Sequence, residues 1–263
     1  MDRSGSRRRR CHMASSRLLS VFLFGILSSC VFSADIPDEI GVTWVKSEPT
    51  GLYFSKYETT VAQYQACLRA GACDAANYFD DEDGCNARSN LRADYPMNCV
   101  SWQGAVEFCK WRGARLPTED EWYAEASNNG SRIYPWGDAP EASCTHCVME
   151  DPAEGRGCGT EGSMLVGSKP LGDSVSGVSD LSGNVSEWTA TEYVIPPPPP
   201  PEPGSEPAGR ASCDGICRVI RGGGYRASND SSLQPYYQAA YRRSGSIEGG
   251  AEYGFRCVAD TLP

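Results

Sequence analysis

The chain has 263 residues and a formal net charge of −10, and this charge is unevenly distributed. Residues 1–33 contain six Arg and one Asp, so the rest of the chain contains 18 basic and 33 acidic residues. A body this acidic repels phosphate backbones, which argues against a nucleic-acid partner. The hydrophobic fraction of 40% is enough for a core, and 28 Gly with 18 Pro favour turns over a helical bundle.

Residues 1–33 have the pattern of a secretory signal peptide. Arginines precede an apolar run, Leu18 to Ser33, which is shorter than the roughly 20 residues of a membrane span. A shorter sequence with the same pattern begins at Met13, so translation could start at Met1 or at Met13. The leader predicts an extracytoplasmic protein, either periplasmic, an outer-membrane lipoprotein or secreted.

The end of the apolar run is compatible with two processing routes. The segment 27–30, Leu-Ser-Ser-Cys, resembles a bacterial lipobox, in which Cys30 would become a lipidated N-terminus. Residues 31–33 instead offer small residues for ordinary cleavage. The first route would attach the protein to a membrane through lipid alone, and a single-span anchor is a third alternative.

Capping residues mark three helix starts in the body of the chain. The helices are predicted at 61–68, at 102–111 and from 119 onward, with Thr60, Ser101 and Thr118 as N-caps. Their buried side chains are predicted to be Ala105, Phe108, Cys109 and Trp111 in the second helix, and Trp122 and Ala126 in the third.

Strands are predicted at 42–45, 52–54, 218–221 and 254–258. Residues 134–180 show almost no periodicity. The Pro-rich stretch within 195–210 cannot enter a helix or a sheet, so we predict a solvent-exposed insertion in one domain over 37–263.

Eleven cysteines follow the leader, and in an exported chain they indicate disulfides. Because eleven is odd, at least one cysteine stays free or pairs between molecules. Proximity along the chain favours Cys147–Cys158 and Cys213–Cys217. We also predict Cys67–Cys73 and Cys85–Cys99, and Cys144 has no assigned partner.

The segment 144–147, Cys-Thr-His-Cys, also has the C-x-x-C spacing of a redox dithiol, or of half a zinc site completed by Cys158. A redox dithiol should open a helix, whereas the residues up to Pro152 stop one. Export also favours disulfides over thiolate ligands, so structural bonds are the preferred interpretation.

Five motifs occur in a fixed order along the body, namely Arg115–Trp122, Tyr134–Gly137, Gly183–Trp188, Arg221–Tyr225 and Gly254–Cys257. In these motifs the sequence resembles the formylglycine-generating enzyme, or sulfatase-modifying factor, family over about 41–260. The resemblance implies one α+β domain related to the C-type lectin fold, with little regular secondary structure.

The resemblance does not extend to the family's catalytic chemistry. Its enzymes oxidise a sulfatase cysteine to formylglycine with two copper-binding cysteines that follow the R-G-G motif, because thiolates hold soft Cu(I). Counted from Tyr225, these positions are Ala227 and Ser232, so neither copper nor a catalytic residue is expected. A second branch of the fold works beside an iron site of several histidines, and His146 is the only histidine after the leader.

The resemblance also implies a calcium loop and one disulfide. Calcium prefers hard oxygen ligands in an irregular turn. The implied ligands are the carboxylates of Asp180 and Glu187 and the backbone carbonyls of Gly183 and Val185. The implied disulfide joins Cys109 to Cys257. The family's other calcium site needs Asn and Asp near 147–160, a segment that here contains Cys147 and Cys158.

The sequence therefore predicts an exported, non-catalytic binding or scaffold module for a peptide, a protein or a glycan. One alternative is an enzyme of altered chemistry that uses residues such as Tyr225, Ser228 and Asp230; another is a copper-dependent oxidase displaced to Cys144 and Cys147. Three arginines could line a cleft for an acidic partner, although pairing with carboxylates is commoner; they are Arg242, Arg243 and Arg256.

Overall fold

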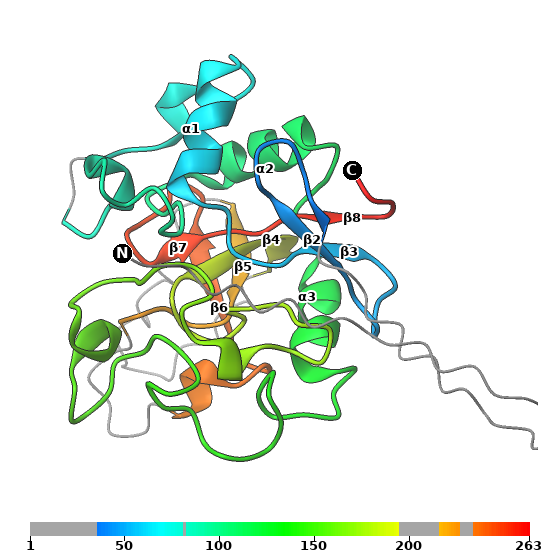
Figure 1. Cartoon of the computed structure of the whole chain (residues 1–263), viewed down its shortest axis with the longest axis vertical. Helices are drawn as coiled ribbons and strands as arrows, with labels where there is room; N and C mark the ends of the chain where they lie inside the picture. The colour runs from blue at the N-terminus through cyan, green and yellow to red at the C-terminus, as the bar shows by residue number, and fades with distance from the viewer. Residues whose placement is uncertain (1–35, 81–82, 195–215, 227–233) are drawn as a thin grey trace, which may run out of the picture. The chain divides into compact units, whose positions relative to one another are not determined.

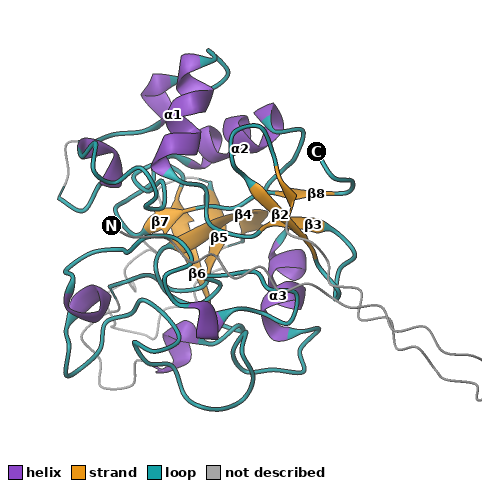
Figure 2. Ribbon diagram, viewed as in Figure 1, coloured by secondary structure: helices purple, strands orange, loops and turns teal. Residues whose placement is uncertain are grey.

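Two four-stranded sheets form the frame of the protein (Figures 1 and 2). The structure is a computed structural model that describes residues 36–80, 83–194, 216–226 and 234–263. The predictions for the leader with Cys30, for the insertion at 195–210 and for Ala227 and Ser232 lie outside the described residues. The described residues from 36 onward belong to one compact unit.

The strand order is β1-β2-β3-β8 in the first sheet and β6-β5-β4-β7 in the second. The strands are β1 (Ile36–Pro37), β2 (Thr43–Lys46), β3 (Tyr53–Ser55), β4 (Ser186–Tyr193), β5 (Cys217–Arg221), β6 (Arg242–Ser246), β7 (Tyr253–Gly254) and β8 (Val258–Ala259). Neighbouring strands are antiparallel except β4 and β7, which are parallel. Figure 2 shows long loop segments between these elements. This agrees with the prediction of an α+β domain that has little regular secondary structure.

The three predicted helices are present and begin at the predicted residues. They are α1 (Val61–Arg69), α2 (Trp102–Trp111) and α3 (Glu119–Ser127), and the short 3-10 helices are η1 (Ala75–Asn77), η2 (Asn86–Arg88), η3 (Arg156–Gly159), η4 (Pro170–Gly172) and η5 (Gln234–Tyr237). Thr60 and Thr118 form complete capping boxes, and the Ser101 hydroxyl accepts from the Gly104 N–H. The predicted inward-facing side chains are all buried except that of Trp111, which is half-buried. Among the described residues no helix is both long and apolar enough to cross a membrane.

The predicted strands at 42–45, 52–54 and 218–221 correspond to β2, β3 and β5, whereas β1 was not predicted. The predicted strand at 254–258 is wrong, because its ends belong to different sheets, β7 and β8. The longest strand, β4, was not predicted. Neither was β6, whose sequence Arg-Arg-Ser-Gly-Ser has no apolar alternation and becomes a strand by pairing with β5.

Four disulfides join described residues, namely Cys67–Cys73, Cys85–Cys99, Cys109–Cys257 and Cys144–Cys158. The Cys109–Cys257 bond ties α2 to the segment between β7 and β8, in the core shared by Trp44, Phe108 and Trp188. Cys217 is disulfide-bonded, while the Cys213 of its predicted pair lies outside the described residues.

The predicted Cys147–Cys158 bond is wrong, since Cys158 pairs with Cys144. The amide of Cys147 donates to the Ser143 carbonyl at 3.0 Å, closing a turn. This turn leaves Cys144 half-buried and places Cys147 in a core cluster with Met149 and Tyr237. Cys147 is therefore the odd cysteine, free and 1% exposed.

Candidate functional site

Three of the five family motifs meet at one end of the second sheet. In the strand register Glu187 of β4 lies between Arg221 of β5 and Gly254 of β7. The loop that carries Asp180 leads into β4, and Tyr225 follows β5 at the same end. Motifs far apart in the sequence thus form one structural layer.

A buried ion pair holds this layer together. The Glu187 carboxylate and the Arg256 guanidinium are both 0% exposed and approach to 2.6 Å. Arg256 also donates to the backbone carbonyls of Ser55, Lys56 and Ser179, and the Trp122 indole N–H donates to Glu187 at 2.8 Å. Burial alone would lower the pKa of Arg256, but the Glu187 carboxylate raises it above its ordinary value. The Arg256 guanidinium therefore stays charged.

A second buried carboxylate, Glu58, clamps the predicted calcium loop. It accepts from the Asn184 side-chain amide at 2.6 Å and from the Val185 backbone N–H at 3.0 Å. Burial raises the pKa of Glu58 well above its ordinary value, and the nearby Asp180 and Glu187 carboxylates raise it further. Sequence reasoning missed Glu58. The only local signal is its place two residues before the Thr60 cap, which does not predict burial.

The loop itself has the irregular backbone expected of a cation site. Asp180 has a φ of 59° and Gly183 a φ of 80°, both in the left-handed region. Asp180 accepts from the Gly167 N–H at 2.6 Å, and burial raises its pKa to about 6. Glu58, Asp180 and Glu187 thus place three buried carboxyl groups around one guanidinium, which is an excess of acidic groups. Glu187, however, already accepts hydrogen bonds from Arg256 and Trp122. The carboxylate of Asp180 therefore has more free oxygen lone pairs than that of Glu187.

Around the buried layer lies a partly exposed rim of arginines and glutamates. Arg226 and Arg243 each approach the Glu252 carboxylate at 3.7 Å, and Arg156 approaches Glu150 at 3.9 Å. The Tyr225 ring is fully buried beneath this rim. Sequence reasoning did not identify Glu252, because it lies outside every motif.

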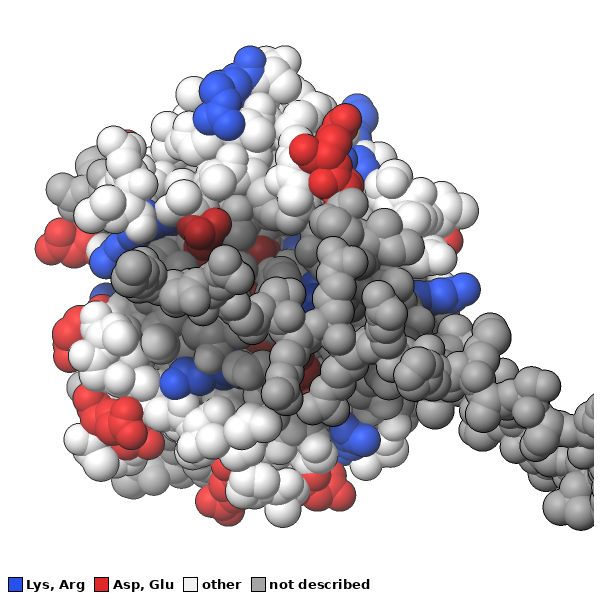
Figure 3. Space-filling model, viewed as in Figure 1, with Lys and Arg blue, Asp and Glu red and all other residues white. Residues whose placement is uncertain are grey.

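The three arginines proposed to line an acidic-partner cleft each pair with a glutamate. Arg242 binds Glu119 at 2.5 Å, and the same carboxylate binds Arg221. Arg256 is wholly committed to Glu187, whereas the contact of Arg243 with Glu252 is longer and weaker. On the face shown in Figure 3, basic and acidic side chains are interspersed, as this pairing implies.

The C-x-x-C segment is not a dithiol. Cys144 is bonded to Cys158, which removes the redox pair and the thiolates of a zinc site. Burial raises the pKa of the Cys147 thiol to about 12. The His146 ring stacks on Trp136 at 5.0 Å, and Trp136 stacks on Tyr134 at 4.8 Å. Among the described residues no group of three or more His, Cys, Asp or Glu side chains is arranged to hold a metal.

Cys147 is expected to resist alkylation in the folded protein, because thiolate is the reactive form and this thiol is buried. Under non-reducing conditions, denaturation should allow maleimide to label the Cys147 peptide, while the Cys144 peptide stays joined to the Cys158 peptide. Peptide mapping by mass spectrometry checks both results, and Cys147→Ser is the control that should abolish the label. A labelled Cys144 peptide would contradict the pairing.

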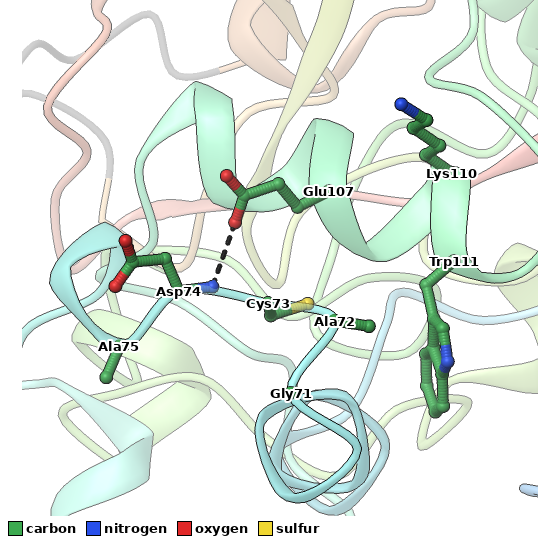
Figure 4. A pocket seen from close by; sticks show the side chains of 8 residues that line it. All are labelled: Gly71, Ala72, Cys73, Asp74, Ala75, Glu107, Lys110 and Trp111. Carbon is green, nitrogen blue, oxygen red and sulfur yellow. Dashed lines mark hydrogen bonds between the residues drawn. The ribbon is translucent and has the colours of Figure 1, made fainter.

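A separate cleft of about 710 Å³ lies between the α1–η1 loop and α2 (Figure 4). It is lined by Gly71, Ala72, Cys73, Asp74, Ala75, Glu107, Lys110 and Trp111. The Glu107 carboxylate accepts from the Asp74 backbone N–H at 3.0 Å and from the Asn77 amide, so it supports the loop. None of the five family motifs contributes to this cleft.

Comparison with known proteins identifies the family. Residues 39–261 match the model of the sulfatase-modifying factor enzyme 1-like domain, and the chain belongs to this family. It is 33% identical over 178 residues to the formylglycine-generating enzyme of Mus musculus, covering 65% of this chain and 46% of the relative. It is 30% identical over 175 residues to a Bos taurus protein named "Inactive C-alpha-formylglycine-generating enzyme 2", covering 64% and 51%.

The chain spans about half the length of these curated relatives. The solved structure of PvdO from Pseudomonas aeruginosa is similar with a TM-score of 0.57 and 21% identity, over 79% of this chain and 80% of that one. This likeness concerns the fold alone. The predicted family and the predicted α+β fold are therefore both confirmed.

Proposed function

We propose that this member of the family is a binding or scaffold module without formylglycine-generating activity. The observation that carries the proposal is that Ala227 and Ser232 stand where the resemblance places the two copper-binding cysteines. Alanine and serine provide no thiolate for Cu(I).

The described part of the chain supports the proposal, because it offers no displaced pair of thiols. Cys144 is in a disulfide, and Cys147 is buried with a raised pKa. An enzyme of altered chemistry around Tyr225 gains no support either. Burial raises the pKa of its hydroxyl, and that hydroxyl has no hydrogen-bond partner among the described residues, so none of them acts as its base.

The protein is expected to leave a C-x-P-x-R peptide unchanged in the presence of copper, oxygen and a reductant. Mass spectrometry of the peptide checks this result. The matched variant is the double replacement Ala227→Cys with Ser232→Cys, which places thiols at the two positions and tests whether they suffice for the reaction. Aldehyde formation by the unaltered protein would overturn the proposed function.

We propose that the 180–187 loop binds calcium through Asp180 and the carbonyls of Gly183 and Val185, with Glu187 shared between the ion and Arg256. The support is the acidic excess of the buried layer. A hundredfold excess of calcium over its Kd should stabilise the fold by about 2.7 kcal/mol. Thermal melts with calcium and with chelator measure this shift. Asp180→Ala should remove it and the exposed Glu154→Ala should keep it; identical melts with and without calcium would contradict the site.

We also propose export, with Cys30 as the candidate lipid site and a membrane contact limited to that lipid. The support is the leader sequence together with four disulfides, which persist in oxidising compartments. The intact mass of the mature protein tests the proposal. An unmodified N-terminus after Ser33 would remove lipidation, and a full-length cytosolic product would remove export.

A further inference from the structure

Four arginines and two glutamates lie around Tyr225 and its neighbour Glu252, and we call the arginines the arginine cluster. The cluster consists of Arg92, Arg156, Arg226 and Arg243, and the glutamates are Glu150 and Glu252. Five segments bring these residues together, namely the turn before α2, the 150–159 segment with η3, the residues after β5, strand β6 and the residue before β7.

Backbone hydrogen bonds fix the segments at this place. The Gly157 N–H donates to the Tyr225 carbonyl at 3.0 Å, and the Tyr225 N–H donates to the Asn184 carbonyl at 2.8 Å. The Ser186 N–H donates to the Glu252 carbonyl at 2.7 Å. The positions of the arginines are therefore set by the sheet rather than by loose surface loops.

The arginine cluster is only weakly neutralised. The contacts of Arg226 and Arg243 with Glu252, at 3.7 Å, are too long for hydrogen bonds, in contrast to 2.6 Å for Arg256 and Glu187. The Nε of Arg226 and the hydroxyl of Tyr225 are buried and have no hydrogen-bond partner among the described residues. These two donors are therefore unpaired within the described part of the chain.

Tyrosine rings orient the guanidinium groups without using their N–H donors. Arg226 lies 5.6 Å from the Tyr225 ring centroid, Arg243 lies 5.5 Å from that of Tyr253, and Arg92 lies 5.3 Å from that of Tyr95. Two further contacts do use a donor, since Arg243 donates to the Tyr253 hydroxyl at 3.0 Å and Arg92 donates to the Asn86 side-chain oxygen at 2.8 Å. Pre-oriented guanidinium groups lose little freedom when they bind an oxyanion.

Charge defines the class of ligand. The described charged groups that act on the pKa values of Tyr225 and Glu252 are the arginine cluster, Glu150 and Glu252, so among these residues the arginines exceed the glutamates by two. We propose that the arginine cluster binds the doubly charged tetrahedral oxyanion of a phosphate monoester. Such a group has three oxygens that accept from more than one guanidinium. This inference rests on the proposed binding function and names the chemistry of its ligand.

Calorimetric titration of the protein with inorganic phosphate, phosphoserine peptide and a sugar phosphate tests the proposal and separates the sources. Binding is expected to exceed that of acetate at equal ionic strength. Arg226→Gln and Arg243→Gln should each weaken it by about tenfold or more. Arg69→Gln, at the exposed end of α1, should leave it unchanged. If one of the cluster variants does not fold, Arg156→Gln replaces it in the titration, because the Arg156 side chain is 43% exposed.

Phosphate binding no tighter than acetate binding would overturn the inference, as would unchanged affinity in folded cluster variants. Either outcome leaves the proposed function intact if the C-x-P-x-R peptide is also unchanged. Aldehyde formation would instead overturn the proposed function whatever the phosphate result, so the two failures are distinguishable.

Discussion

Replacing Cys109 with Ser is expected to lower the free energy of unfolding by about 2–5 kcal/mol. The bond to Cys257 has a sequence separation of 148 residues, so its loss frees a very long loop in the unfolded chain. In the chain-entropy model a loop of this length is worth nearly 5 kcal/mol, and strain or residual structure lowers the observed value. Urea denaturation under non-reducing conditions measures the loss.

Cys67→Ser is the matched control for this prediction. Cys67 and Cys109 are both 0% exposed, so the two serines meet similar burial, but the Cys67–Cys73 separation is only 6 residues. The same model gives about 2 kcal/mol for the short loop. Equal losses in the two variants would contradict the loop argument, and a Cys109 peptide found free in the native protein would contradict the pairing itself.

Arg256→Met is expected to destabilise the protein by about 3–5 kcal/mol, because it removes one partner of a fully buried ion pair. It also leaves the carboxyl groups of Glu58, Asp180 and Glu187 without their cation. Combining Arg256→Met with Glu187→Gln should recover part of this loss, since the uncompensated charge is then gone. A double-mutant cycle in urea measures the coupling.

The control for Arg256 is Arg115→Met, in a surface pair with Glu121. Those side chains are 41% and 24% exposed, and such pairs contribute about 0–1 kcal/mol. If Arg256→Met cost no more than Arg115→Met, or if Glu187→Gln had the same effect with and without Arg256, the buried pair would not be the centre of this layer.

The Cys109–Cys257 bond and the Glu187–Arg256 pair do not depend on the two positions at which the family's copper ligands are expected. Neither the Cys109–Cys257 bond nor the Glu187–Arg256 pair includes Ala227 or Ser232. Under the proposed function, the absence of thiols at those two positions would therefore not remove either interaction.

The sequence alone determined the features whose causes lie within a few residues. Each helix begins where a side chain caps a backbone N–H three residues away, as Thr60 does for Gln63 and Thr118 does for Glu121. The five ordered motifs likewise sufficed to identify the family and its fold. Short-range hydrogen bonds and the order of motifs can both be recognised from the sequence without the tertiary structure.

Only the tertiary structure decided the contacts between distant segments. Proximity along the chain favoured Cys147 as the partner of Cys158, but the turn at Ser143 buries Cys147 and leaves Cys144 to form the bond. Strand β6 exists because β5 pairs with it, and not because of its own residues. Glu58 became part of the site through hydrogen bonds across 126 and 127 residues. These contacts depend on which residues the fold buries and which distant segments it brings together, and no local sequence pattern encodes either.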